Sequence, residues 1–448
     1  MKTDLTTGSL PKLIIILAIP ALGSMLSDTL FHLINTFWIG KLGYKALAAQ
    51  TASAFVIWMI FTCTNLVTIG VTAIIARRIG EKKADVAHQT TLQAIVISIY
   101  LSIIIGFLLA ITNNYIMDFI KAEADVTILI KEFLTVYIIG IPSIFLFMTI
   151  DAIFKAYGDT KTPMLILTFS LFINVCLDPI LIFGLDLGFK GAAFATIIAR
   201  LFGIVYGLIV LQKKIIIKSA HSDGNSIKNL LQIDIKLALQ FIKIGLPPML
   251  SGILFSLVYI ALARIINNFG SEALAAIGIG HRVESISYCT FMALSIAVTT
   301  IVGQNMGAGK IQRAEEAVHY SYLIGLGLSC IIAVIFLVFP EKIILLMTSD
   351  QNVIVAGALY LRITAASLIF MAFELITQGG FNGAGNTLPP MFFNILFTLI
   401  RIPLAYYLAI YLNWTIAGVW WAINISAILK GVSLAFWFNL GYWKQKKV

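Results

Sequence analysis

Charged side chains are in short supply in this 448-residue chain. Asp, Glu, Lys and Arg together make up 12% of it, whereas an average soluble domain contains about 25%. Apolar runs of 18 or more residues with few charges, the pattern of transmembrane helices, recur from end to end and leave no room for a large soluble domain. The composition therefore excludes a soluble globular protein and predicts an all-α membrane protein.

Residues that could build a catalytic or metal centre are also scarce. The four cysteines all fall within apolar runs, and neither a CxxC pair nor a zinc-ligand spacing occurs. The five histidines are scattered, and we find neither a paired nucleophile and base nor a GxxxxGK[ST] phosphate loop. We therefore expect no enzyme, no metal site and no cofactor, and an ion gradient as the source of energy.

The net charge of +10 would suggest a nucleic-acid partner in a soluble protein. Here the basic residues are concentrated in alternate connections between apolar runs, such as 77–83 and 213–236. Positive residues mark the cytoplasmic side of a membrane protein. This bias predicts that the partner is a lipid bilayer and not nucleic acid. It also predicts a multi-pass protein of the inner (plasma) membrane with both termini in the cytoplasm.

Twelve spans can be placed along the chain, and the one long polar connection, 213–236, is interpreted as a cytoplasmic linker. The predicted spans are 13–39, 46–76, 90–112, 126–148, 162–184, 191–212, 237–263, 273–302, 317–339, 352–377, 389–411 and 416–440.

A shift of 227 residues aligns the two halves without gaps. GYKALAA at 43–49 falls on GSEALAA at 270–276, and GDTKTPM at 158–164 falls on GNTLPPM at 385–391. Since each half has six spans, an even number, both halves enter the membrane from the same side. The repeat predicts two parallel six-helix lobes, 1–212 and 237–448, an arrangement found in transporters with a midplane substrate site between the lobes.

One cluster of polar residues within the spans is present in the first half and absent from the second. Residues four and seven apart share a helix face, which groups Asp28 with His32 and Asn35, and Asn174 with Asp178. Their equivalents 227 residues later are Phe255, Tyr259, Leu262, Arg401 and Ala405. A charge at mid-membrane costs ~2.5–3.5 kcal/mol, and burial favours the neutral form of a carboxyl. Such an acid can therefore exchange protons.

These observations define the candidate ion-coupling and substrate-binding residues: Asp28, His32, Asn35, Asn174, Asp178 and Glu374. A structural role is the alternative for each. Asp178 precedes Pro179, which frees a backbone carbonyl and can kink the helix, and a lone histidine often only packs between helices. Arg401 and Lys430 are either counter-ions or snorkelling side chains.

Several stretches resemble the multidrug and toxic compound extrusion (MATE) family. They are IGKLGYKALAA at 39–49, YGDTKTPM at 157–164, NVCLDPILIFG at 174–184, IGIGHRVESI at 277–286, VGQNMGAGKIQRAEEA at 302–317 and FNGAGNTLPPM at 381–391. The resemblance implies twelve helices in two six-helix lobes with a V-shaped cleft. It also implies antiport, in which a proton or sodium gradient drives export of organic, often cationic, compounds.

One position departs from the pattern that the resemblance implies. NVCLDP is similar to the proton-coupled prokaryotic branch, so Asn174 and Asp178 match the fifth-helix pair of that branch. Asn35, however, stands where the family usually carries Asp on the first helix, and the nearest acid is Asp28. The seventh-helix acid of some sodium-coupled members is absent from LSGILFSLVYIALA, whereas Glu374 remains on the tenth.

We therefore expect a secondary active antiporter that exports organic, cationic compounds in exchange for protons or sodium ions, and that works as a monomer. The alternative is a lipid-linked precursor flippase of the same superfamily. A flippase for polyanionic lipids needs a cleft lined by Arg and Lys, so the acidic first-half cluster favours cationic cargo. The substrates and the coupling ion stay open at this point.

Overall fold

The structure is a computed structural model that describes residues 4–120, 124–216 and 233–446. Within these ranges every regular element is helical, as predicted, whereas most of the predicted linker, residues 217–232, lies outside the described residues. The elements are α1 (Leu10–Gly40), α2 (Tyr44–Cys63), α3 (Asn65–Gly80), α4 (Ala84–Ile120), α5 (Ala124–Ala156), α6 (Lys161–Pro179), η1 (Ile180–Gly184), α7 (Gly188–Leu211), η2 (Gln212–Ile216), α10 (Ile235–Asn267), α11 (Ser271–Gly307), α12 (Ile311–Val338), α13 (Pro340–Leu345), α14 (Gln351–Ala365), α15 (Leu368–Ala384), α16 (Leu388–Tyr406), η3 (Tyr407–Tyr411), α17 (Thr415–Asn439) and η4 (Tyr442–Gln445).

The described residues form eleven helices that are long and apolar enough to cross a membrane, or twelve if α14 and α15 count as one span. This confirms the all-α membrane fold. The predicted span 352–377 is not one straight helix, because α14 and α15 meet at an angle of 58°. Ser367 at the bend hydrogen-bonds with the Thr364 carbonyl and with the Asn424 side chain, which satisfies polar groups that the broken helix leaves open.

Contacts divide the chain into two compact units. Unit 1 comprises Met1–Asp4 and Ile19–Met249, and unit 2 comprises Leu5–Ala18 and Leu250–Val448. The first part of α1 thus packs with unit 2 and the first part of α10 with unit 1. The division into lobes 1–212 and 237–448 stays a prediction from the sequence repeat.

Hydrogen bonds and close approaches account for these two exchanged segments. In unit 2 the Asn305 side chain donates to the Leu5 carbonyl over 3.1 Å, and Lys310 Nζ donates to the Thr6 carbonyl over 2.8 Å. In unit 1 a Cβ at Gly245 would lie 2.2 Å from the Asn65 carbonyl oxygen, so α10 touches the backbone of α3. Only glycine permits that approach.

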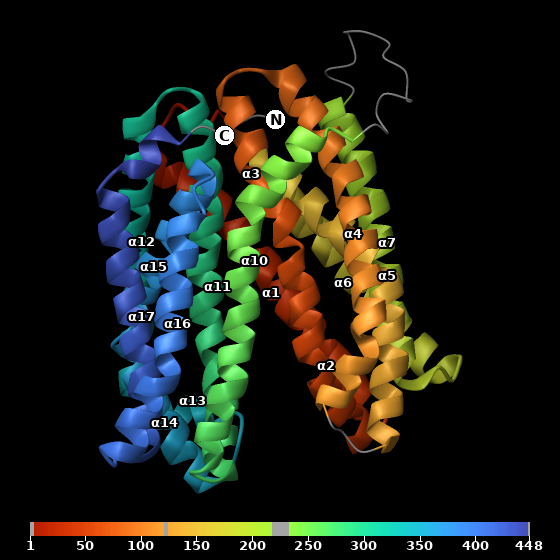
Figure 1. The fold of residues 1–448 in the computed structure, drawn as a ribbon, viewed down its shortest axis with the longest axis vertical. Helices are drawn as coiled ribbons and strands as arrows, with labels where there is room; N and C mark the ends of the chain where they lie inside the picture. The colour runs from red at the N-terminus through yellow and green to blue at the C-terminus, as the bar shows by residue number, and fades with distance from the viewer. Residues whose placement is uncertain (1–3, 121–123, 217–232, 447–448) are drawn as a thin grey trace. The chain divides into compact units, whose positions relative to one another are not determined.

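Each unit is a bundle of helices with its own core (Figure 1). In unit 1, α5 packs against α4 and α7, and α7 also packs against α6. In unit 2, α11 packs against α12 and α15, and α17 packs against α15 and α16. Among the candidate spans, those of α5 and α11 are the most enclosed. Polar residues on their neighbours can therefore be shielded from lipid within a single unit.

The backbone repeats with the same 227-residue offset as the sequence. Both α6 and α16 pass into a π-helical segment, η1 and η3. Positive φ angles also recur in pairs: Gly43 and Gly270, Lys82 and Gly309, Gly158 and Gly385, Asp186 and Asn413, and Gly188 and Thr415. The turns therefore keep the same conformation in both halves even where the residue type differs.

Candidate ion-coupling site

The candidate site is built on α6, whose first turn is fixed by Asp159. Asp159 accepts hydrogen bonds from the backbone N–H of Thr162, over 2.9 Å, and from its hydroxyl, over 2.6 Å. A side chain at this position satisfies N–H groups that the first helical turn leaves without partners. From there α6 runs inward and places Asn174 and Asp178 one turn apart, both 0% exposed.

Outside the spans, the charge of Asp159 is well stabilised. Burial disfavours its ionised form, but the hydrogen bonds from Thr162 and a bond from Lys214 Nζ, over 3.0 Å, outweigh burial and lower the pKa of the Asp159 carboxyl. The turn between α5 and α6 is thereby fastened to η2 in the ionised state of Asp159.

Asn35, Asn174 and Asp178 meet in the interior of unit 1. Asn174 Nδ2 donates to Asp178 Oδ1 over 3.3 Å. The amide orientation of Asn35 that satisfies both of its polar atoms directs its nitrogen to the same carboxylate, 2.6 Å from Asp178 Oδ2. Asn35 is 7% exposed. The residue at the departure from the family pattern thus contacts the acid that matches the pattern.

Asp28 and His32 lie apart from this buried cluster. Their side chains are 43% and 56% exposed, and Asp28 Oδ2 lies 3.7 Å from His32 Nε2. Seven residues separate Asp28 from Asn35, which is about 10 Å along a helix. The structure therefore brings together Asn35, Asn174 and Asp178, and it leaves the other two candidates of α1 paired with each other.

Three further residues of unit 1 belong near the cluster. Thr196 of α7 lies 3.4 Å from the Asn35 amide, and Tyr137 is close enough to Asp28, Asp178 and Arg200 for their charges to act on it. Arg200 is 5% exposed, and its guanidinium lies 4.7 Å from the Phe61 ring centre. Sequence reasoning missed them, although an intramembrane arginine in a run such as ATIIARLFG is a visible signal.

Glu374, the remaining candidate, lies in unit 2 and is already paired. Lys430 Nζ donates to Glu374 Oε1 over 2.9 Å, and the two side chains are 7% and 11% exposed. This resolves one alternative left by the sequence, because Lys430 is a counter-ion and does not snorkel. Its ammonium stands at the carboxylate, where a coupling cation would have to bind.

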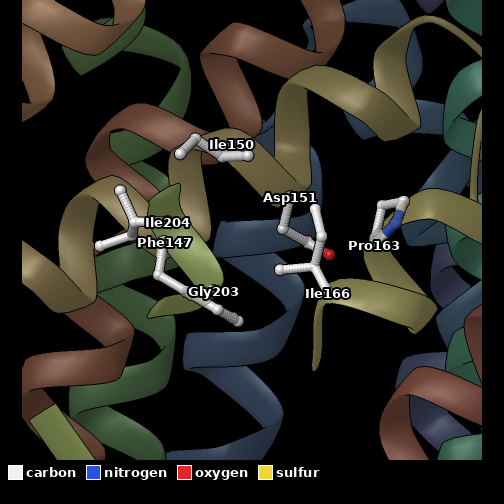
Figure 2. A pocket seen from close by; sticks show the side chains of 7 residues that line it. All are labelled: Phe147, Ile150, Asp151, Pro163, Ile166, Gly203 and Ile204. Atoms are coloured by element: carbon white, nitrogen blue, oxygen red, sulfur yellow. The ribbon is translucent and has the colours of Figure 1, made fainter. Parts of the chain in front are cut away.

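The repeat shows what replaces this ion pair in unit 1. The positions 227 residues before Glu374 and Lys430 hold Phe147 and Gly203, which line one small cavity together with Asp151 and Pro163 (Figure 2). A Cβ at Gly203 would lie 2.7 Å from the Phe147 ring. An apolar contact in unit 1 therefore occupies the positions that hold an ion pair in unit 2.

A helical chain with this many candidate spans, and with a carboxyl and amide cluster buried inside them, has the architecture of a secondary transporter. A comparison with protein-family models identifies the class more closely. The model of the MATE family matches the chain twice, at residues 20–180 and 247–407, and the two ranges differ by the repeat offset. The chain belongs to the MATE family of multi-pass membrane transporters, which are not enzymes.

Similar proteins extend over nearly the whole length of the chain. "Probable multidrug resistance protein NorM" of Thermotoga maritima is 27% identical and covers 98% of this chain and 94% of its own. A protein of Shewanella oneidensis named "FAD transporter" is 26% identical, with coverages of 96% and 95%. A solved outward-facing MATE multidrug resistance transporter has a TM-score of 0.90 at 22% identity and covers each chain fully, which confirms the fold.

Proposed function

We propose that this protein is a proton-coupled antiporter that exports organic cations by alternating access. Asp178 carries the proposal, because it is a fully buried carboxyl within a candidate span and contacts two amide side chains. The multidrug resistance names of several relatives support this cargo. We favour it over a lipid-linked precursor flippase because the buried cluster of unit 1 contains a carboxyl group, which attracts cations.

The proposed exchange follows from the charge of a single carboxyl group. Ionised Asp178 is costly in a membrane interior, and either a proton or an organic cation can neutralise it. Because one neutralises the carboxyl at the expense of the other, cation binding displaces the proton and protonation releases the cation. Asn35 cannot ionise, so it serves in this scheme as a permanent hydrogen-bond donor where the family usually has a second acid.

Two contacts favour the proton over sodium as the coupling ion. Both Asn35 and Asn174 direct amide N–H groups toward the Asp178 carboxylate, whereas a sodium ion needs oxygen ligands turned toward it. In unit 2 the Lys430 ammonium already neutralises Glu374. The alternative sodium site at Glu374 would require that ion pair to open.

Transport by the purified protein in sealed proteoliposomes tests this proposal. Ethidium movement should follow an imposed pH gradient and should not respond to a sodium gradient of the same size. In Asp178→Asn, which keeps the size and hydrogen bonding of the side chain, pH-driven transport should fall to the background of empty vesicles. Movement driven by sodium alone, or by neither gradient, contradicts proton coupling.

A matched control uses another acid of the same unit. Asp151 forms an ion pair with Lys155 one turn away, over 2.6 Å, and takes no part in the proposed exchange. Asp151→Asn should retain most of the pH-driven transport of the parent protein. Equal losses in both variants would mean that any acid in unit 1 is needed for folding, and that Asp178 has no special role.

A further inference from the structure

Arg401 is a buried cation in unit 2 that is only partly satisfied. It is 3% exposed; its Nε donates to Ser426 Oγ over 2.5 Å, and Nη1 donates to the Tyr259 hydroxyl over 3.2 Å. Its guanidinium carbon lies 5.8 Å from the Phe255 ring centre and 5.7 Å from that of Tyr259. A guanidinium has five N–H donors, so Nη2 remains available for a ligand.

Carboxylates near Arg401 are engaged by other side chains. Within the described ranges no Asp or Glu lies within ion-pair distance of it, and the acids whose charges reach its neighbour Tyr259 are Glu284 and Glu374. Glu374 is held by Lys430, and Glu284 accepts a hydrogen bond from the Tyr360 hydroxyl. Since an unpaired buried charge is costly, a fork of free donors in this position is suited to an anion that arrives with a ligand.

The sequence repeat relates Arg401 to a residue of the polar cluster in unit 1. It is the equivalent of Asn174, and Tyr259 and Phe255 are the equivalents of His32 and Asp28. Where unit 1 holds an amide, an imidazole and a carboxyl, unit 2 therefore holds a guanidinium beside two neighbouring aromatic rings. Aromatic faces support a guanidinium without neutralising it, so the positive charge stays available.

We infer that Arg401 binds an acidic group, a carboxylate or a phosphate, of the organic substrate. The inference rests on the proposed function and deepens it: the preferred substrates carry an acidic group beside their cationic or aromatic part. Planar acids suit the guanidinium because it can donate two parallel hydrogen bonds to them. Nη2 and the second N–H of Nη1 provide this pair of donors.

Two dyes that differ in one carboxyl group provide the test. Rhodamine B has a free carboxylate, which its ethyl ester lacks. Binding to the purified full chain, measured by fluorescence polarisation, is compared in the parent protein, Arg401→Gln and the control Arg264→Gln, whose side chain is exposed at the end of α10. Arg401→Gln should weaken the binding of rhodamine B by about tenfold to a hundredfold and should change the affinity for the ester by no more than about twofold. Arg264→Gln should change neither affinity.

Arg401→Lys keeps the test decisive if Arg401→Gln does not fold. Lysine retains the charge but not the planar arrangement of donors, so the affinity for rhodamine B should fall by a few-fold and the affinity for the ester should not change. Flavin mononucleotide and riboflavin, which differ in one phosphate, form the second arm and tell whether the site prefers phosphate or carboxylate. If neither acid-bearing dye loses affinity relative to its partner without the acidic group, or if the binding of both members of each pair weakens equally, the inference is overturned.

Transport distinguishes this inference from the proposed function. The ethyl ester should still be exported by Arg401→Gln under a pH gradient, because it needs only the Asp178 site. Failure of the parent protein to export the ester would refute the proposed function. Equal export of rhodamine B by the parent and Arg401→Gln would refute the role of Arg401 alone.

Discussion

Removing one partner of the Lys430–Glu374 ion pair should destabilise unit 2 far more than removing both. The two charged groups are 2.9 Å apart and their side chains are 7% and 11% exposed. Lys430→Met leaves a buried carboxylate without its counter-ion, and Glu374→Leu leaves a buried ammonium. The double variant leaves neither, and Phe147 and Gly203 already provide an apolar contact at the equivalent positions of unit 1.

The expected magnitudes follow from this geometry. At 2.9 Å and an effective dielectric constant of about 20, the Coulomb attraction is about 6 kcal/mol. Desolvation offsets much of it, and breaking a buried pair by removing one partner costs about 3–5 kcal/mol. We expect that loss in each single variant. The double variant should lie within about 2 kcal/mol of the parent, since buried pairs are often replaced by apolar residues without loss.

Unfolding in mixed micelles, followed by the fluorescence of the seven tryptophans, gives these free energies. The more exposed pair of Lys444 and Glu315, with Nζ–Oε2 2.8 Å, is the matched control, and Lys444→Met should cost at most about 1 kcal/mol. Additive losses in the double variant would refute the pairing argument. A double variant that folds but no longer transports ethidium would instead identify Glu374 as the coupling acid.

Three further outcomes are expected. Asp159→Asn should lower the melting temperature at neutral pH. Because the folded-state pKa of Asp159 is lowered, that deficit should persist above the ordinary aspartate pKa of about 3.9 and vanish as the pH falls through the lowered pKa; a deficit that is constant down to acid pH would contradict this. Gly191→Ala and Gly418→Ala should both reduce stability by more than about 1 kcal/mol, because a Cβ would lie 2.8 Å from the Leu181 carbonyl oxygen and 2.5 Å from the Ala409 nitrogen. A Cβ at Gly327 would have no atom within 4 Å, so Gly327→Ala should stabilise its helix by up to about 1 kcal/mol. The unfolding midpoints of the three variants test these expectations. Asp28→Asn should keep pH-driven ethidium transport, because its side chain is 43% exposed and pairs with His32; a loss equal to that of Asp178→Asn would place Asp28 in the exchange.

The helical class and the span positions could be predicted from sequence because apolar runs and a fixed repeat offset act over many residues at once. The bend between α14 and α15 could not, since the run 352–377 is apolar throughout and its break depends on contacts of Ser367 with another helix. The grouping of residues 5–18 with unit 2 likewise depends on long-range packing, which no local sequence pattern predicts.

The candidate site was predictable in its types of residue but not in its contacts. Helical spacing placed Asp28, His32 and Asn35 on one face of α1, yet only Asn35 reaches Asp178. Spacing specifies a face and not a depth, and depth depends on which helix packs there. The pairing of Lys430 with Glu374 could not be predicted for the same reason, because the two residues lie on different helices and are 56 positions apart in the sequence.

Proton release on cation binding tests the central claim most directly. In weakly buffered detergent solution, the parent protein should release about one proton for each ethidium ion bound, since the cation replaces the proton on one carboxyl group. Asp178→Asn, which has no proton to exchange at this position, should release none, while Asp151→Asn should behave like the parent. Unchanged proton release from folded Asp178→Asn would contradict the assignment of Asp178 as the coupling residue.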